Sequence, residues 1–483
     1  MGMSYSGLPA FCRVEINLNT YNNSPATAEV WLPDSDSYKG RYLTAGNGGL
    51  GGSINYGALA YSGLKNGFAA ASTDGGHSSQ NATEWALENP YRDDAIIDFG
   101  WRAIYTMTEA AKVIVAEYYG KKAKNSYYVG CSDGGRQGLK SIQKFPEQFD
   151  GVVVGSPANF ISHQQAWSIW MSKHVLPVNG SSWIPSEMWP VIGAEVDRQC
   201  DLIDGVADGI INDPRKCDFD PSYLACNDNA TSTSDCLGAD QITAVRKIFA
   251  PWVDANQTTI FDGYYPVGSA DASAYATVHL AATAPDMIGL SFYRNFVYND
   301  TTWAWENLTA EDAFTYDEVN PGDMVANSPD LRGFAGESHG GKLLHYVGLA
   351  DPNISPGNPL TYHRRVREFM TLNSDVDTDD FYRFFPVPAM AHCSGGSGAS
   401  AFGSADSSSS TPPLAYDADH SALLAMVEWV EEGEAPEKIV AAKYIDDDSS
   451  NGLNFTRPIC AYPREITYKG EGSIWNATNF ECV

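Results

Sequence analysis

The feature that most restricts how this chain of 483 residues can fold is the motif GCSDGG at 130–135. It follows a stretch typical of a strand, 126–129, and opens a stretch typical of a helix, 133–145. A G-x-S-x-G sequence between a strand and a helix is a nucleophile elbow, a turn so tight that side chains at the glycine positions would clash with the backbone. The sequence therefore predicts that Ser132 is a nucleophile at the end of a strand.

Strand-like and helix-like stretches alternate around this motif. The predicted strands are 28–32, 42–45, 68–72, 126–129, 151–154, 342–349, 381–385 and 439–444, and the predicted helices are 93–119, 133–145, 359–371 and 421–432. Such alternation is typical of a mostly parallel sheet with helices on both faces. Together with the elbow, it predicts an α/β-hydrolase fold.

The alternation stops between residues 178 and 339. This stretch contains four of the nine cysteines, together with tryptophan-rich segments and many turn-forming residues. We therefore expect an inserted domain at 178–339, with residues 1–177 and 340–483 forming one catalytic domain. A run rich in glycine and serine at 394–413 is expected to be a mobile loop.

An elbow serine becomes a strong nucleophile only when a neighbouring base takes its proton. In sheet enzymes with this elbow, an acidic residue and a histidine follow the serine in chain order, each at the end of a later strand. Asp351 follows one predicted strand and His392 follows the next. Other histidines, such as His77 before the elbow and His345 inside a strand, fit this order less well. The sequence predicts a triad of Ser132, Asp351 and His392.

Two cysteines adjoin the predicted nucleophile and base. Cys131 precedes Ser132, and Cys393 follows His392. If Ser132 and His392 are within hydrogen-bonding distance, their neighbours can reach the Cα separation of about 5.5 Å that a disulfide needs. We therefore expect a Cys131–Cys393 disulfide that holds nucleophile and base together; the alternative is two unrelated thiols.

The oxyanion hole of such an enzyme needs two backbone N–H groups. One is expected from Asp133, the residue after the nucleophile, so its carboxylate is not the acid of the triad. The second is expected from Gly49 or Gly48, in the glycine-rich segment 46–52 that follows a predicted strand. The alternative, a phosphate-binding loop, is disfavoured because no Lys-Ser or Lys-Thr pair follows it.

A third motif, CDLIDGVADGI at 200–210, combines three aspartates with two glycines. Carboxylates in tight turns suit a hard cation, most of all calcium. The expected ligands are the side chains of Asp201, Asp204 and Asp208 and the carbonyl groups of Val206 and Ile210. Because the loop belongs to the insertion, we expect calcium to have a structural role; the alternative is a solvated acidic loop.

Charge and composition disfavour several kinds of partner. The chain has 60 acidic and 31 basic residues and a formal net charge of −29, which disfavours binding to nucleic acid and to anionic membranes. No apolar run approaches the roughly 18–20 residues that span a bilayer. We expect no organic cofactor, and the sequence leaves the oligomeric state open.

Nine cysteines and ten Asn-x-Ser/Thr sequons are typical of a secreted glycoprotein with disulfides. The first residues, MGMS, have neither the basic nor the apolar region of a signal peptide. We therefore expect that the signal peptide was removed or that the start is truncated. The odd number of cysteines favours truncation.

Short segments along nearly the whole chain resemble the fungal tannase and feruloyl esterase family. They are LPAFCRV at 8–14, GNGG at 46–49, STDGGH at 72–77, DFGWRA at 98–103, GCSDGGRQG at 130–138, FPEQFDGVVVGSPA at 145–158, the Asp-rich loop from Cys200, GLADPNISP at 348–356 and AHCSGG at 391–396. The resemblance implies the same triad, the Cys131–Cys393 disulfide, the calcium loop and a lid formed by the insertion. One departure is Gly75, which stands where the family motif has threonine, with no expected consequence for the triad.

The resemblance also implies a disulfide pattern for the other cysteines. The implied pairs are Cys200–Cys217, Cys226–Cys236 and Cys460–Cys482, and Cys12 is left unpaired.

From the residues and the resemblance together, we expect a secreted serine carboxylesterase. Its substrate would be an ester between a small aromatic acid and a carbohydrate alcohol. A hydroxycinnamoyl group is expected ahead of a galloyl group. The alternatives are a tannase and, from another class, a non-catalytic carbohydrate-binding protein on an esterase scaffold. Aromatic residues of the insertion are expected to offer the acyl group a flat apolar surface, the alternative for each being the core of the lid. They are Phe292, Tyr293, Phe296, Tyr298 and Trp303.

Overall fold

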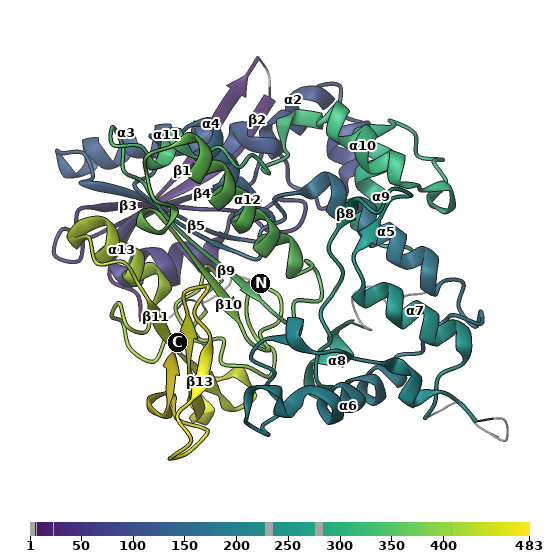
Figure 1. Cartoon of the computed structure of the whole chain (residues 1–483). Coiled ribbons are helices and arrows are strands. Elements are labelled where there is room, and N and C mark those ends of the chain that lie inside the picture. Colours follow the sequence, from purple (N-terminus) through teal and green to yellow (C-terminus); the bar gives the residue numbers. More distant parts are fainter. Residues whose placement is uncertain (1–4, 6, 23, 228–234, 276–283, 407) are drawn as a thin grey trace.

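The computed structural model describes residues 5, 7–22, 24–227, 235–275, 284–406 and 408–483. Its main sheet consists of β1 (Phe11–Tyr21), β2 (Ser24–Pro33), β3 (Arg41–Ala45), β4 (Phe68–Thr73), β5 (Asn125–Cys131), β6 (Gly151–Gly155), β9 (Lys342–Gly348) and β10 (Tyr382–Val387). The strands are hydrogen-bonded in the order β1-β2-β4-β3-β5-β6-β9-β10 (Figure 1). The pairs β1–β2 and β2–β4 are antiparallel, and the pairs from β4 to β10 are parallel, as the alternation predicts.

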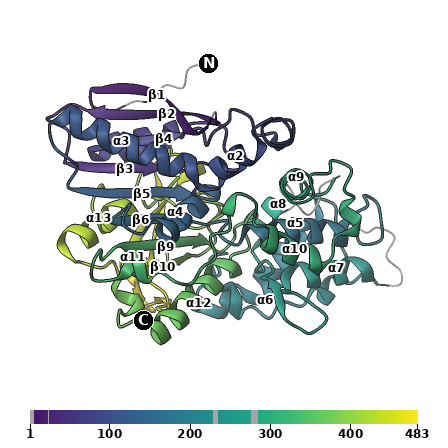
Figure 2. The same ribbon diagram turned by 90° about the horizontal axis from the view of Figure 1, so that it is seen from above.

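Helices cover both faces of this sheet (Figures 1 and 2). One face packs against α3 (Ala103–Tyr119), α4 (Asp133–Lys144), α11 (Arg332–Ala335) and α12 (Gly357–Asn373). The other packs against α13 (Ala422–Glu432) and the short turns from α1 (Tyr56–Ala58) to residue 66. Within β6, Val152 and Val154 enter the first cluster and Val153 the second, so the strand is apolar throughout.

In the described residues between β6 and β9, the chain adds no strand to the main sheet and forms a separate group of elements beside it (Figure 2). The group contains α5 (Ile161–Val175), α6 (Met188–Cys200), α7 (Ala239–Phe249), α8 (Ser269–Tyr275), α9 (Met287–Phe292), α10 (Ala310–Val319) and the paired strands β7 (Trp252–Val253) and β8 (Thr259–Phe261). Buried aromatic residues such as Trp167, Trp189 and Tyr316 form its core.

The packing of two helices bears on the expected boundaries of this insertion. Helix α5 precedes residue 178, yet its side chains belong to the core of the inserted group. Helix α11 precedes residue 340, yet Phe334 packs on the main sheet. The packing indicates that the chain passes from the main sheet to the inserted group near residue 160 and returns to the sheet near residue 326. The boundaries 178 and 339 stay a prediction.

The end of the chain forms two small antiparallel sheets. Strand β11 (Lys438–Tyr444) pairs with β12 (Leu453–Cys460), and β13 (Ile466–Tyr468) pairs with β14 (Phe480–Cys482). The predicted strand at 439–444 is therefore present but lies outside the main sheet.

The long predicted helix at 93–119 is present with an irregular turn inside it. It consists of α2 (Arg92–Ile97), a π-helical turn at Asp98–Arg102, and α3. Asp98 is buried in that turn, where it accepts hydrogen bonds from Arg102, Thr20 and Ser24. In the part of the chain that the structure describes, no helix is both long and apolar enough to cross a membrane.

Candidate active site

Ser132 lies in a tight turn between β5 and α4. Its backbone φ is +62°, a value that residues other than glycine rarely adopt. The turn depends on glycine: a Cβ on Gly130 would lie 2.5 Å from the carbonyl oxygen of Gly134, and one on Gly134 would lie 2.5 Å from that of Asn47. The N–H of Ser132 donates to Gly155 at 3.0 Å, which ties the turn to β6. The strand, turn and helix of the predicted elbow are all present.

Asp351 and His392 follow the neighbouring parallel strands β9 and β10. Nδ1 of His392 lies 2.8 Å from Oδ2 and 3.0 Å from Oδ1 of Asp351. The Asp351 side chain is fully buried, and its Oδ1 also accepts the N–H groups of Asn353 and Ile354. These bonds fix the carboxylate and favour the tautomer of His392 with its proton on Nδ1, which leaves Nε2 as a base.

The environment of His392 raises its pKa. Burial opposes a second proton on the ring, but the charge of Asp351 and its hydrogen bond outweigh burial. Asp406 raises the pKa of His392 further through its negative charge. The ring is therefore readily protonated, as a group that must accept and return a proton requires.

The Cys131–Cys393 disulfide joins the turn after β5 to the loop after β10, with a Cα–Cα distance of 5.9 Å. Ser132 and His392, the neighbours of the two cysteines, line one cavity of about 260 Å³. The structure thus brings the predicted nucleophile and base to the same cavity, with Asp351 buried behind the base.

Two of the three residues proposed for the oxyanion hole line this cavity. Asp133 is the first residue of α4, so its N–H has no acceptor within the helix. Gly49 also lines this cavity, whereas Gly48 lines a second cavity. The Asp133 carboxylate is bound to the buried Arg136 guanidinium at 2.6 Å, which agrees with its exclusion from the triad.

Side chains that the sequence analysis did not assign to the site hold the glycine-rich segment 46–52. Nε2 of His77 lies 2.6 Å from the carbonyl oxygen of Leu50, and its ring stacks on Trp85 with centroids 3.9 Å apart. Oε1 of Gln80 accepts the N–H of Leu50 at 3.0 Å, and its Nε2 donates to Gly51. The only sequence signal for His77 was its place in the family-like segment at 72–77.

One face of α5 forms much of the cavity wall. Ile161, Gln164, Gln165 and Ser168 recur at helical spacing and all line it. The remaining lining residues that the structure describes are Gly49, Ser132, Asp133, Ala158, Asp286, Ile288, Phe292, Asn353, Ile354 and His392. The cavity is therefore apolar in part, with amide, hydroxyl and carboxylate groups among its walls.

Of the five aromatic residues expected to contact substrate, Phe292 lines the cavity. Tyr293 and Phe296 are buried in the core of the inserted group. Trp303 stacks on Tyr293 at 5.1 Å and on Tyr298 at 5.5 Å between ring centroids. Tyr293, Tyr298 and Trp303 pack on one another, whereas Phe296 packs on Phe292, Phe99 and Trp85.

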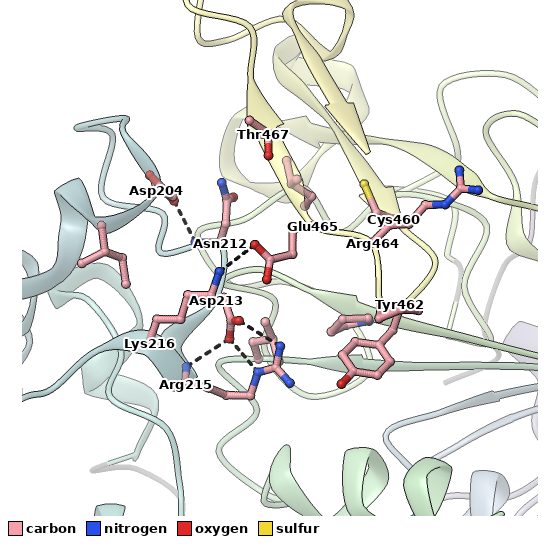
Figure 3. A pocket seen from close by; sticks show the side chains of 15 residues that line it. Asp204, Asn212, Asp213, Arg215, Lys216, Cys460, Tyr462, Arg464, Glu465 and Thr467 are labelled. Atoms are coloured by element: carbon pink, nitrogen blue, oxygen red, sulfur yellow. Dashed lines mark hydrogen bonds and ion pairs between the residues drawn. The ribbon is translucent and has the colours of Figure 1, made fainter. Parts of the chain in front are cut away.

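The Asp-rich loop lies beside the C-terminal strands, and Figure 3 shows the cavity between them. Oδ2 of Asp204 accepts the N–H of Asn212 at 3.0 Å, and Oδ1 accepts that of Val206 at 3.1 Å. Oδ1 of Asp201 accepts the N–H of Gly209 at 2.8 Å. The aspartates therefore shape the backbone of their own loop.

The same loop was predicted to bind calcium. Burial raises the pKa of Asp201 and Asp204, and the nearby charge of Asp208 adds to this, a situation that a cation would relieve. Asp208, however, is paired with the buried Arg457 at 2.6 Å. Among the described residues, no group of three or more acidic, histidine or cysteine side chains is arranged to hold a metal ion. The oxygen donors suit calcium in their chemistry, and the site stays a prediction.

The structure contains the other disulfides that the resemblance implies. They are Cys200–Cys217, Cys226–Cys236 and Cys460–Cys482, and Cys12 is free. The first two lie in the insertion and the third closes the C-terminal strands.

Known proteins resemble this chain over nearly its whole length. A model of the family described as "Tannase and feruloyl esterase" matches residues 12–483. A probable feruloyl esterase B-2 of Neosartorya fischeri is 38% identical over 481 residues, which cover 98% of this chain and 86% of that protein. A probable feruloyl esterase B of Aspergillus clavatus is 37% identical over 473 residues, with the same coverage of 98% and 86%.

Solved structures of similar proteins share the fold. Feruloyl esterase B from Aspergillus oryzae is 33% identical and superposes with a TM-score of 0.90, covering 100% of this chain and 94% of its own. A tannin acyl hydrolase from Aspergillus niger, 23% identical, has a TM-score of 0.76 with coverage of 98% and 86%. The expected α/β-hydrolase fold is confirmed. The chain belongs to the tannase and feruloyl esterase family and is a carboxylic ester hydrolase.

Proposed function

We propose that this esterase is a secreted serine hydrolase that cleaves esters of small aromatic acids, above all hydroxycinnamoyl esters of plant cell-wall polysaccharide. The observation that carries the proposal is the hydrogen bond between His392 and the buried Asp351, with His392 and Ser132 on the wall of one cavity. Ile161, Phe292 and Ile354 in that wall support an aromatic acyl group. The names of the similar feruloyl esterases support the hydroxycinnamoyl class.

In the proposed reaction, Nε2 of His392 takes the hydroxyl proton of Ser132 as Oγ bonds to the ester carbonyl carbon. The carbonyl electron pair moves onto oxygen, where the N–H groups of Asp133 and Gly49 stabilise it. The C–O bond to the alcohol then breaks, and the alcohol takes the proton from His392. Water attacks the acyl group on Ser132 by the same steps and releases the acid.

Asp351 has no bond to make or break in this reaction. Its carboxylate keeps the His392 ring in one orientation and balances the positive charge that the ring gains in each step. Because Asp351 is buried and fixed by two backbone N–H groups, this charge is in place before the substrate binds.

A second cavity supports a carbohydrate as the alcohol. Its lining includes Gly48, the chain neighbour of Gly49, and Ser394 and Gly395, which closely follow His392, the proposed proton donor to the leaving alcohol. Its other described walls are mainly hydroxyl, amide and carboxylate groups with tyrosine rings, among them Tyr56 and Tyr61, and they include no lysine or arginine. Such a surface suits a neutral polyol.

Secretion and a structural calcium ion belong to the same proposal. Four disulfides support an oxidising compartment, where such bonds persist. Calcium would be held by the side chains of Asp201, Asp204 and Asp208 and the carbonyl groups of Val206 and Ile210. It would stiffen the insertion and take no part in the chemistry.

The proposal is tested by initial rates on methyl ferulate, methyl p-coumarate, methyl gallate and a short p-nitrophenyl ester, with Ser132→Ala beside the native enzyme. We expect the hydroxycinnamates to be preferred. Ser132→Ala should abolish turnover and change the melting temperature by only a few degrees, since it removes a single oxygen atom. Near-normal activity of Ser132→Ala would contradict the serine mechanism.

The same rates decide between the alternatives. Preference for methyl gallate would make the enzyme a tannase. Turnover of the p-nitrophenyl ester alone would leave the serine mechanism in place with a different natural ester. Failure on all four esters would favour a non-catalytic carbohydrate-binding protein.

A further inference from the structure

The cavity that contains Ser132 changes from apolar to polar along α5. Ile161 lines it at the start of the helix, Gln164 and Gln165 one turn later, and Ser168 after a further turn. With a rise of about 1.5 Å per residue, these levels are roughly 5 Å and 10 Å from Ile161 along the helix axis. An acyl group that extends along α5 therefore meets polar side chains beyond its apolar portion.

Gln164 differs from its polar neighbours in having a buried atom without a partner. The residue is only 6% exposed, and its Oε1 has no hydrogen-bond partner among the described residues. Ser168, by contrast, is within 3.0 Å of both the Gln165 carbonyl oxygen and Asp286 Oδ2. A buried polar atom without a partner is unfavourable, and a ligand that supplies the missing hydrogen bond would relieve this.

The side-chain amide of Gln164 suits one kind of ligand group. Gln164 lines the cavity, and rotation of its amide by half a turn exchanges Oε1 and Nε2, so the side chain can offer a ligand either an acceptor or a donor. A phenolic hydroxyl group can do both in return. An aromatic acyl group without such a hydroxyl would leave the amide buried and unpaired.

The charges around the cavity also restrict which substituents the acyl group can carry. Asp286 contributes a carboxylate, and the lining residues that the structure describes include no lysine or arginine. A second carboxylate on the acyl group would be buried without a cation, which is unfavourable. A neutral ring hydroxyl meets no such penalty.

We propose that Gln164 selects acyl groups with a phenolic hydroxyl, by hydrogen bonding to that hydroxyl through its side-chain amide. This inference rests on the proposed hydrolysis of aromatic esters and assigns the residue that distinguishes among them. Gln164 takes no part in making or breaking bonds and acts on specificity alone.

The test compares methyl p-coumarate with methyl cinnamate, which differ only in the ring hydroxyl. For the native enzyme, kcat/KM should favour p-coumarate about tenfold, the effect of one hydrogen bond in a buried site. Gln164→Leu should bring this ratio close to one by losing activity on p-coumarate and keeping that on cinnamate. Its melting temperature should be equal or higher, because the variant removes a buried atom that lacks a partner.

Gln165→Leu is the matched control, since Gln165 is the next residue on α5 and also lines the cavity. Gln165→Leu should keep the native ratio of kcat/KM on methyl p-coumarate to kcat/KM on methyl cinnamate. A methyl cinnamate with a para-carboxylate should be a poorer substrate than either ester.

Several results would overturn the assignment. They are a native ratio of one, an equal loss of both activities in Gln164→Leu, the same loss of ratio in Gln165→Leu, or a para-carboxylate ester as good as p-coumarate. A native enzyme that hydrolyses neither methyl ester would instead overturn the proposed function, and this inference with it.

Discussion

At the scale of single residues, the proposed mechanism makes the pKa of His392 decide the pH range in which Ser132 can be activated. A general base works only in its neutral form. Because Asp351 and Asp406 raise the pKa of His392 above its ordinary value near 6.5, the ring takes up its proton at a higher pH than a free histidine would. Activity should therefore begin to fall with decreasing pH earlier than the ordinary pKa would suggest.

A substitution of Asp406 should move the pH at which activity falls without changing the reaction itself. Asp406→Asn removes a negative charge near His392, so the acid limb of kcat/KM should shift to lower pH while the plateau rate stays unchanged. The measurement is a pH profile on methyl ferulate, whose methanol is too small to use the second cavity. Asp351→Asn should behave differently and lower kcat by about 10⁴-fold, since a neutral amide no longer favours the His392 tautomer with its proton on Nδ1.

Asp447→Asn is the control for Asp406→Asn. Asp447 lines the same second cavity but forms an ion pair with Lys443 and has no part in the raised pKa of His392. The same shift of the acid limb in both variants would mean that the net charge of the protein, and not the position of Asp406, sets the pH at which activity falls.

At the scale of elements, His77 is one of the side chains that hold the glycine-rich segment 46–52, together with Gln80. Burial lowers the pKa of His77, so the ring stays neutral and its Nε2–H donates to the Leu50 carbonyl. His77→Phe keeps a ring against Trp85 and loses that hydrogen bond. We expect kcat to fall roughly tenfold to a hundredfold with little change in KM, because Gly49 would no longer be held at the oxyanion.

His339→Phe is the matched comparison for this element. It removes a similar bond, from His339 to the carbonyl oxygen of Phe149 at 2.8 Å, outside the cavity. It should lower the melting temperature and leave kcat unchanged. An equal fall of kcat in both variants would contradict a positioning role for His77.

The elements that carry the predicted triad could be located from the sequence because local signals mark them. The elbow needs glycine at 130 and 134, and the carboxyl ends of β9 and β10 can be read from apolar runs followed by Asp351 and His392. These signals depend on residues close together in the chain, so a single sequence suffices.

Other elements depend on packing between distant segments and were missed. Strand β1 was not predicted because, as the edge strand, it alternates exposed and half-buried residues without an apolar run. Helix α5 was not predicted because nearly all its side chains are buried, which removes the helical periodicity. For the same reason the sequence could not separate Phe292, at the cavity, from Tyr293 and Phe296 in the core.

At the scale of the whole molecule, the disulfides differ in what they constrain. Cys131–Cys393 closes a separation of 262 residues, and Cys226–Cys236 one of 10. In the chain-entropy picture, the first stabilises the fold by up to about 5 kcal/mol and the second by about 3 kcal/mol. Replacing Cys131 and Cys393 by alanine should therefore lower both the melting temperature and kcat, because nucleophile and base lose their link.

The double variant of Cys226 and Cys236 is the control. It should lower the melting temperature less and leave kcat near the native value. A greater loss of activity in this variant than in the Cys131 and Cys393 variant would contradict the role of the longer link.

The proposed calcium loop makes a prediction at the same scale. An excess of chelator should lower the melting temperature by several degrees, and added calcium, but not magnesium, should restore it, since the loop offers flexible oxygen ligands. Initial rates well below the melting temperature should stay unchanged. A protein shown to contain no calcium that melts identically with and without the added ion would refute the site.

The position of the Cys131–Cys393 disulfide also bears on how the molecule responds to proteases. This bond is the one among the four disulfides that crosses the insertion, and the serine precedes that insertion while the acid and the histidine follow it. A single cut anywhere between residues 132 and 392 therefore leaves two fragments that are still covalently joined beside Ser132 and His392, the proposed nucleophile and base. Such a nicked enzyme would migrate as one chain under non-reducing conditions and as two after reduction, and in a protease-rich medium it would keep Ser132 and His392 together.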